Sequence, residues 1–325
     1  MSKEPVIQID NLSLSIGELD ILCGVSFNVA AGQTLAIVGE SGCGKSMTAL
    51  AIMGLLPEGA IITSGSIKLN DRDLVGLPEG QMQNIRGNEI SMIFQEPVLA
   101  LDPLMPVGNQ IAEALTAHVQ TSSGDAMNEA LSLLDRVGIP EAQKRLKQYP
   151  FELSGGMCQR IMIAIALACR PGVLIADEPT TALDVTIQAQ ILRLISSLGN
   201  ELQTALVLIT HDLGVVADMA DQVAVMYGGS IVELGELDDI FARPGHPYTK
   251  ALLRSIPRLD TIPKAELEVI SGMVPDARNW PKGCRFHPRC TSAMPRCTIE
   301  RPLLEPDGES PDHFVACWLT QEEKK

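Results

Sequence analysis

The feature that most constrains this chain is a glycine-rich octapeptide between an apolar run and a helix-like stretch. The apolar run covers residues 34–38, and the octapeptide that follows reads Gly39-Glu40-Ser41-Gly42-Cys43-Gly44-Lys45-Ser46. This order matches the phosphate-binding loop pattern, in which glycines let the backbone bend around phosphates so that N–H groups point at their oxygens. The helix-like stretch, residues 47–54, would add the partial positive charge of its first turn. The sequence therefore predicts a strand, a loop and a helix that together bind a nucleotide.

Two side chains at the end of the loop have separate predicted roles in binding ATP with Mg²⁺. Lys45 is expected to neutralise the β- and γ-phosphates, and the Ser46 hydroxyl to ligate the metal ion. Cys43 occupies a position that the pattern leaves open, so we give its thiol no role. The loop by itself indicates nucleotide binding and does not distinguish a transporter motor from a kinase or a GTPase.

Further apolar runs indicate the rest of the core. Residues 173–176 and 205–209 are, like residues 34–38, apolar without interruption, which is typical of strands buried on both faces of a parallel sheet. Helical patterns, such as residues 159–169 and 188–198, lie between these runs. Buried strands that alternate with helices predict an α/β doubly wound core.

Two additions to this core are expected. Residues 6–15, 26–29 and 65–69 partly alternate between apolar and polar, which indicates half-buried strands of an antiparallel β subdomain. Residues 96–156 lack strong strand patterns and are predicted to form a helical insertion. We also expect a boundary at residue 255, because residues 256–325 are rich in Pro, Cys and charge. The prediction is therefore a core domain, residues 1–255, followed by a small Cys-rich C-terminal module.

Composition and hydropathy exclude other classes. The formal net charge is −15 and we find no basic stripe, so a role in nucleic-acid binding is disfavoured. The longest apolar stretch, residues 161–169, is far shorter than the roughly 20 residues that a membrane span needs. The first residues lack the apolar run of a signal peptide, and we expect the chain to remain in the cytosol.

Two acids follow one of the buried strands. Asp177 and Glu178 come directly after the apolar residues 173–176. Side chains alternate along a strand, so the two carboxylates should point in different directions. We expect Asp177 to reach Mg²⁺ through water, and Glu178 to face the γ-phosphate and polarise the attacking water.

About 20 residues before that strand comes a second motif, Leu153-Ser154-Gly155-Gly156-Met157. At this motif the chain resembles the ABC ATPase family, and the resemblance implies that it is the signature motif. Ser154 and Gly156 would then contact the γ-phosphate of an ATP molecule held by the opposite subunit. Met157 stands where glutamine is usual, as it does in one branch of the family, and Cys158 stands where a basic residue is common.

Three further residues match the family in the expected order. Gln95 resembles the Q-loop glutamine, which touches Mg²⁺ and links the site to the membrane subunits. Asp184 resembles the D-loop aspartate at the dimer interface, and His211 resembles the switch histidine that contacts the γ-phosphate. The sequence departs from the family at Ile16, where an aromatic residue usually stacks on adenine. We therefore expect weaker and less base-selective nucleotide binding.

Two features resemble one branch, the oligopeptide, dipeptide and nickel import ATPases. The first is the run Arg243-Pro244-Gly245-His246-Pro247-Tyr248-Thr249-Lys250-Ala251-Leu252-Leu253. The second is a C-terminal cysteine group, Cys284, Cys290, Cys297 and Cys317. Met157 resembles the first of the two distinct ATPases that such importers usually carry.

The four C-terminal cysteines have the spacing C-x5-C-x6-C-x19-C, which differs from the paired C-x2-C arrangement of a zinc ribbon. Four thiolates can hold a [4Fe–4S] cluster, and the resemblance to this branch implies such a cluster at these cysteines. Structural zinc and metal-free, packed thiols are the alternatives. A metal would stabilise a small module that can bury little core of its own.

The resemblance implies an ATP-hydrolysing subunit that powers an importer of peptides, or of a related solute such as nickel. Two such subunits would enclose two ATP molecules and drive two integral membrane permease subunits, on the cytoplasmic face of the bacterial inner membrane. The partner would be a second, similar ATPase, and an extracytoplasmic binding protein would deliver the solute. The alternatives are an exporter motor and a soluble ABC ATPase of translation or DNA repair. The latter usually carries two cores or a long coiled coil, and this chain has one core and no sustained heptads.

Overall fold

The computed structural model describes residues 4–181, 183–255 and 270–322, and these residues form two compact units. The first unit contains residues 4–7, 29–33 and the described part of 69–208. The second contains residues 8–28 and 34–68, together with the described residues from 209 onward. The phosphate-binding loop and the C-terminal segment, which we define as residues 270–322, therefore belong to the same unit.

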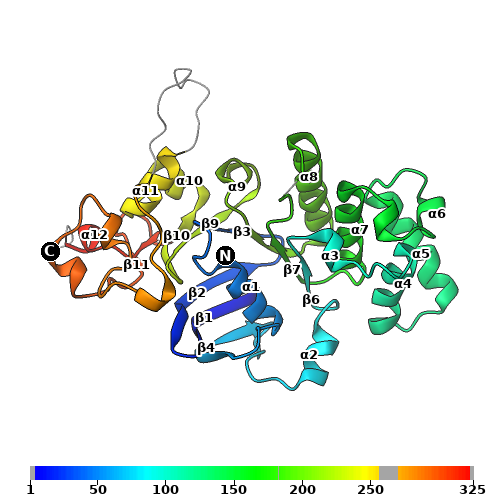
Figure 1. Ribbon diagram of the computed structural model, residues 1–325, viewed down its shortest axis with the longest axis horizontal. Helices are drawn as coiled ribbons and strands as arrows, with labels where there is room; N and C mark the ends of the chain where they lie inside the picture. Colours follow the sequence, from blue (N-terminus) through cyan, green and yellow to red (C-terminus); the bar gives the residue numbers. More distant parts are fainter. Residues whose placement is uncertain (1–3, 182, 256–269, 323–325) are drawn as a thin grey trace. The chain divides into compact units, whose positions relative to one another are not determined.

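The second unit is built on a mixed sheet with the strand order β11-β12-β10-β9-β3 (Figure 1). Its strands are β3 (Thr34–Val38), β9 (Gln222–Tyr227), β10 (Ser230–Glu236), β11 (Glu305–Pro306) and β12 (Phe314–Val315). β3 pairs with β9 in parallel, while β10 pairs antiparallel with both β9 and β12. Glu233 of β10 lies opposite Val315 of β12, so the C-terminal segment extends the core sheet by two short strands.

A further sheet has the strand order β2-β1-β4-β5, formed by β1 (Pro5–Ile16), β2 (Leu19–Ala30), β4 (Ala60–Leu69) and β5 (Arg72–Asp73). Two residues, Gly17 and Glu18, join β1 to its neighbour β2, so these strands form an antiparallel hairpin. Leu12 and Leu14 are buried while Ser13 between them is half-buried, which is the predicted alternation. The predicted antiparallel subdomain is confirmed.

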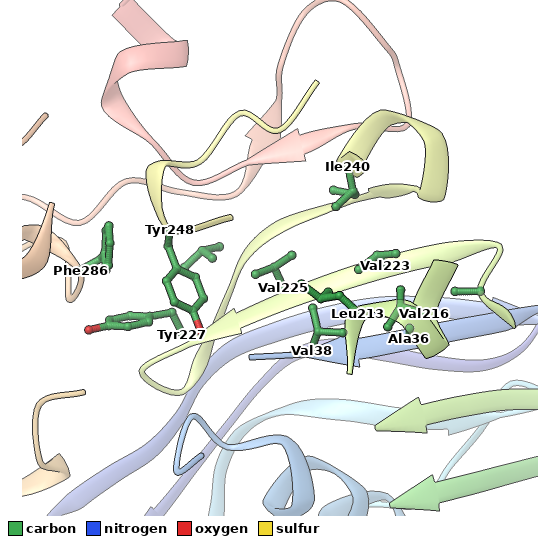
Figure 2. Close-up of a cluster of buried hydrophobic side chains, with 12 residues drawn as sticks. Ala36, Val38, Leu213, Val216, Val223, Val225, Tyr227, Ile240, Tyr248 and Phe286 are labelled. Atoms are coloured by element: carbon green, nitrogen blue, oxygen red, sulfur yellow. The ribbon is translucent and has the colours of Figure 1, made fainter. Parts of the chain in front are cut away.

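The helices of the second unit are α1 (Lys45–Met53), α9 (Leu213–Met219), α10 (Leu237–Ala242), α11 (Pro247–Arg254) and α12 (Trp318–Glu322). Short 3-10 turns occur in the C-terminal segment at Ala277–Asn279, His287–Arg289 and Pro295–Thr298. A buried cluster joins β3, β9, α9 and α10, where aliphatic side chains such as Val38, Val225 and Val216 pack together. Figure 2 shows that Tyr227, Tyr248 and Phe286 lie together at one end of this cluster.

The first unit contains strands in the order β8-β7-β6, formed by β6 (Ile90–Ile93), β7 (Val173–Asp177) and β8 (Ala205–Ile209). β6 and β7 are parallel, with Ile90 opposite Val173. All residues of β7 and β8 are buried, as uninterrupted apolar runs predict. Its helices are α2 (Glu79–Ile85), α3 (Pro97–Ala100), α4 (Val107–His118), α5 (Ser123–Arg136), α6 (Ala142–Arg145), α7 (Gly155–Leu167) and α8 (Val185–Leu202).

Every element between β6 and β7 is helical, including a 3-10 turn at Pro150–Glu152, and α4, α5 and α7 contact one another (Figure 1). The helical patterns at residues 159–169 and 188–198 correspond to α7 and α8. α7 begins before its predicted start and ends before its predicted end, whereas α8 extends beyond both predicted ends. The α/β core predicted from strand and helix alternation is therefore confirmed. Within the described ranges, no helix is both long and apolar enough to cross a membrane.

Candidate functional site

The phosphate-binding loop connects β3 to α1 in the second unit. Gly39 has φ +154°, and a Cβ added there would lie 2.2 Å from the carbonyl oxygen of Met226 in β9, so only glycine fits. Gly44, with φ +107°, directly precedes the first residue of α1. The loop is thus packed tightly against the end of β9, and its backbone depends on glycine at both ends.

Lys45 lies inside this loop, with only 6% of its surface exposed. Its ammonium donates to the carbonyl oxygens of Gly39 at 2.7 Å and Glu40 at 3.2 Å. Ser46, the next residue, is exposed in the first turn of α1. Cys43 is fully buried, and burial raises the pKa of its thiol although nearby Lys45 opposes the shift. The loop therefore holds one buried positive charge and one exposed hydroxyl beside a helix N-terminus.

The two acids at the end of β7 differ in their surroundings. Asp177 is the last residue of the strand and is 5% exposed, whereas Glu178 is half-buried and has the unusual φ of 44°. The Glu178 carboxylate accepts from the Gln95 amide at 3.2 Å and from the Thr181 hydroxyl at 3.0 Å. The structure thus brings together Gln95 and Glu178, two of the residues that the sequence analysis singled out. The turn after β7 fixes the direction of the Glu178 carboxylate.

The motif at residues 153–157 forms the N-terminus of α7. Ser154 is the N-cap, and its hydroxyl accepts from the Met157 N–H at 3.4 Å. Ser154 and Gly155 are exposed, so a helix start with accessible N–H groups faces solvent. Cys158 is fully buried, and its thiol lies 3.5 Å from the carbonyl oxygen of Pro150. A basic side chain would be poorly accommodated in this position.

Two of the remaining predicted residues lie at helix starts. Asp184 caps α8, and its carboxylate accepts from the N–H groups of Thr186 and Ile187 at 3.1 and 3.0 Å. His211 is exposed and follows the end of β8, immediately before the residue that caps α9. Gln95, Asp177, Glu178, residues 153–157 and Asp184 belong to the first unit. Ile16, the phosphate-binding loop and His211 belong to the second.

Ile16 is the last residue of β1 and is half-buried. Replacing it with tyrosine should restore a ring that can stack on adenine, so we expect Ile16→Tyr to bind ATP about fivefold more tightly, which corresponds to about 1 kcal/mol. The gain for GTP should differ from the gain for ATP. The measurement compares the dissociation constants of both nucleotides for the two proteins, and equal values in both would contradict the assignment of Ile16.

The run at residues 243–253 is anchored by a buried acid that the sequence analysis missed. Glu233 of β10 is fully buried and accepts from the N–H groups of Gly245 at 2.6 Å and His246 at 2.9 Å. His313, also fully buried, lies 2.8 Å from the same carboxylate. Burial acts to lower the pKa of His313, but the carboxylates of Glu233 and Asp307 together outweigh burial and raise the pKa. From the sequence alone, a glutamate within a strand is expected to face solvent. The role of Glu233 depends on partners that are distant in the sequence, such as His313.

Within this run, His246 fixes the start of α11. Burial lowers the pKa of His246 to about 4, so its imidazole is neutral at neutral pH. Its Nδ1 accepts from the Tyr248 N–H at 3.0 Å and thereby caps the helix. The Tyr248 hydroxyl in turn accepts from the Glu40 N–H of the phosphate-binding loop at 2.9 Å. The run therefore contacts the loop directly.

The four C-terminal cysteines line a single small cavity of about 20 Å³, together with Phe286 and Trp318. Burial raises the pKa of the Cys317 thiol to about 11, and it also raises the pKa values of Cys284 and Cys290. None of the four forms a disulfide. Across the described ranges, no group of three or more His, Cys, Asp or Glu side chains is placed to hold a metal ion. As the thiols stand they do not fit the predicted cluster or a zinc ion.

Comparison with known protein families gives two matches. The family described as ABC transporter matches residues 22–181, and the family described as the C-terminal region of oligopeptide/dipeptide transporters matches residues 232–297. The first match includes the loop at Gly39–Ser46, the motif at residues 153–157, and the acids Asp177 and Glu178 at the end of β7. The second includes the anchored run and three of the four C-terminal cysteines.

Among curated proteins, the dipeptide transport ATP-binding protein DppD of Bacillus subtilis is 51% identical over 321 residues, which cover 97% of this chain and 95% of that protein. The oligopeptide transport ATP-binding protein OppD of Salmonella typhimurium is 49% identical over 307 residues, covering 94% and 90%. Among solved structures, a dimeric ATP-binding cassette in a post-hydrolysis state with ADP and phosphate is similar with a TM-score of 0.64. The two sequences are 27% identical, and the alignment covers 71% of this chain and 98% of the chain in that structure.

Proposed function

We propose that this chain, which belongs to the ABC transporter family of ATP-binding proteins, is the ATP-hydrolysing subunit of a peptide importer. The observation that carries the proposal is the near-complete match, at about half identity, to ATP-binding proteins of dipeptide and oligopeptide transport. The match extends through residues 232–297, beyond the ATPase core. A soluble ABC ATPase is not favoured by this extent of similarity.

The phosphate-binding loop supplies the charge and the backbone donors for ATP. We assign the β- and γ-phosphates to the buried Lys45 ammonium and to the N–H groups of Gly39–Ser46. The loop lies at the start of α1, whose first N–H groups favour an anion. Ile16 would cover one face of adenine by aliphatic packing.

The two carboxylates at the end of β7, Asp177 and Glu178, would supply the chemistry of hydrolysis. Glu178 is assigned as the group that polarises the attacking water, because Gln95 and Thr181 hold its carboxylate in one direction. Mg²⁺, when bound with ATP, neutralises charge on the phosphates, and the oxygen donors of Ser46, Gln95 and Asp177 are of the type that it prefers. His211 would contact the γ-phosphate.

Two ATPase subunits would enclose two ATP molecules head to tail. In this arrangement the exposed start of α7, with Ser154 and Gly156, would contact the γ-phosphate held by the opposite subunit. Asp184 would lie at the subunit interface. Binding would close the pair and hydrolysis would reopen it, so that ATP drives a change between two states. This assignment rests on the family and on the exposure of the α7 start.

The partners proposed are two permease subunits, a second ATPase of similar sequence and an extracytoplasmic solute-binding protein. The chain would be peripheral, at the cytoplasmic face of the bacterial inner membrane. The Gln95 region and the helices between β6 and β7 would pass the motion to the permeases. We further propose that residues 1–255 form the ATPase domain, with its helical part at about 96–156, and that 256–325 form a C-terminal module. Residues 256–269 and 323–325 of that module lie outside the described residues.

The proposal is tested by isolating the chain with its natural partners. A tagged copy is expressed in the source bacterium, the membranes are extracted in mild detergent, and the co-purifying proteins are identified by mass spectrometry. We expect two different multispanning proteins and a second ATPase. Recovery of ribosomal or DNA-repair proteins instead would contradict the transport function and leave only nucleotide chemistry.

The predicted [4Fe–4S] cluster stays a proposal that rests on the four cysteines lining one cavity, since the positions of the thiols in the described residues do not themselves form a metal site. Anaerobically purified protein should then contain about four iron and four sulfide ions per chain. Cys290→Ser should lower this content. Cys169→Ser should not, because the Cys169 thiol lies outside this cavity, 3.4 Å from the carbonyl oxygen of Ala114 in α4. Protein with zinc in place of iron, or with neither metal, would refute the cluster.

A further inference from the structure

An arginine of the C-terminal segment is bonded to the phosphate-binding loop of the same unit. Arg289 donates from Nη1 to Glu40 Oε2 at 2.6 Å and from Nη2 to Glu40 Oε1 at 3.0 Å. The Arg289 side chain is 4% exposed and that of Glu40 is 30% exposed. Such a two-point pair fixes the orientation of a carboxylate as well as neutralising it. Glu40 is therefore directed toward the C-terminal segment.

Arg289 is itself held by the start of the C-terminal segment and by the core. Its Nε donates to the carbonyl oxygen of Ser271 at 2.9 Å, and its Nη2 donates to those of Ile270 and Gly272, each at 3.2 Å. Its Nη1 also lies 3.4 Å from the Tyr227 hydroxyl at the end of β9. With these partners the guanidinium has one well-defined position, so it can hold Glu40 without being displaced itself.

The backbone of Glu40 is held by a second contact. Its N–H donates to the Tyr248 hydroxyl at 2.9 Å. Tyr248 is fully buried, and its ring centroid lies 4.8 Å from that of Tyr227 and 5.4 Å from that of Phe286. Figure 2 shows the three rings together. Two of the chain's three tyrosines thus meet behind the loop. The anchored run and the C-terminal segment converge on one residue of the phosphate-binding loop.

The charge of Glu40 explains why such contacts matter. A carboxylate next to bound phosphates repels them, and in a partly buried site this repulsion is poorly screened. The Arg289 guanidinium cancels the charge and turns the carboxylate toward the C-terminal segment. Without Arg289, the loop would carry Lys45 and an unneutralised Glu40 side by side.

We propose that Arg289 is a positioning residue for ATP, which neutralises and orients Glu40 so that the affinity of the phosphate-binding loop depends on the C-terminal segment. This inference rests on the proposed function, because it requires that the loop bind ATP. It gives the C-terminal segment a role in nucleotide binding through an arginine that is not one of the four cysteines. The Tyr248 hydroxyl contacts the same loop residue by accepting from the backbone N–H of Glu40.

The test is a double-mutant cycle on the affinity for a non-hydrolysable ATP analogue, measured on the assembly purified from membranes. Arg289→Gln should weaken binding about tenfold, because Glu40 is then unneutralised. The loss should be smaller for ADP, which carries less negative charge. The double variant Glu40→Gln with Arg289→Gln should recover most of the loss. A purely structural role for Arg289 predicts no such recovery.

Arg278→Gln is the matched control, since it removes an arginine of the same segment whose side chain pairs with Asp276. Its affinity should equal that of the wild type. If Arg289→Gln does not fold, Arg289→Lys takes its place in the cycle. Arg289→Lys should weaken analogue binding by less, and adding Glu40→Gln should again restore the affinity. The inference would be overturned if Arg289→Gln weakened analogue binding equally with and without Glu40→Gln, or if Arg289→Gln did not weaken it at all. A wild type that does not bind the analogue would instead refute the ATPase proposal.

Discussion

Glu178→Gln is expected to lower the rate of ATP hydrolysis by about 10²- to 10⁴-fold, which is the range that one general acid–base group contributes. The glutamine side chain can still accept from Gln95 and Thr181, so the local structure should persist. It cannot take a proton from the attacking water, so hydrolysis of the bound ATP should be slowed by this factor. ATP affinity should be retained. The measurement is phosphate release by the membrane-derived assembly, together with equilibrium ATP binding.

Glu201→Gln is the control for this substitution. Glu201 is in the same unit, and its exposed side chain forms an ion pair with Arg136 at 3.0 Å. Surface pairs of this kind contribute little to stability, so both hydrolysis and binding should match the wild type. A Glu178→Gln assembly that hydrolyses ATP at nearly the wild-type rate would remove Glu178 from its assigned role.

Lys45→Ala is expected to weaken ATP binding by between about tenfold and a hundredfold, which corresponds to the loss of one hydrogen bond to a charged group. The ammonium is buried within the loop, where its interaction with phosphate is less screened than at the surface. It also bonds the carbonyl oxygen of Gly39 at 2.7 Å, so the loop should become less ordered. Hydrolysis should fall together with binding.

Lys282→Ala provides the comparison for this variant, because Lys282 is an exposed lysine of the same unit. It removes one positive charge without touching the loop, and ATP affinity should not change. Thermal unfolding of both variants separates loss of binding from loss of folding. An unchanged affinity in folded Lys45→Ala would show that the loop does not bind phosphates as proposed.

The core of the fold could be predicted from the sequence because its signals are local. Uninterrupted apolar residues predicted β3, β7 and β8, and the alternation of residues 6–15 predicted β1. Glycines at fixed spacing identified the loop, because few other residues allow the φ of +154° at Gly39. The start of α7 at Ser154 likewise follows from a local cap.

Contacts between distant residues could not be predicted in the same way. Glu233 and His313 are 80 residues apart, and Glu40 and Arg289 are 249 apart, so no periodicity connects them. Each pair depends on how the C-terminal segment joins the sheet through β12. The composition of residues 256–325 predicted an appended module, whereas residues 305–306 and 314–315 pair as strands of the mixed sheet. The extension of α8 to Leu202 was also missed, since helix ends carry weak signals.

The most direct test of the central claim is ATP-driven peptide uptake by the purified assembly. The assembly is reconstituted in liposomes that enclose Mg-ATP, with its binding protein and a panel of labelled di- to pentapeptides and Ni²⁺ outside. We predict that peptides accumulate inside with the wild type and with Glu201→Gln, and fail to accumulate with Glu178→Gln or without ATP. Accumulation of no solute in the panel by an assembly that hydrolyses ATP, or uptake that does not depend on ATP, would contradict the account.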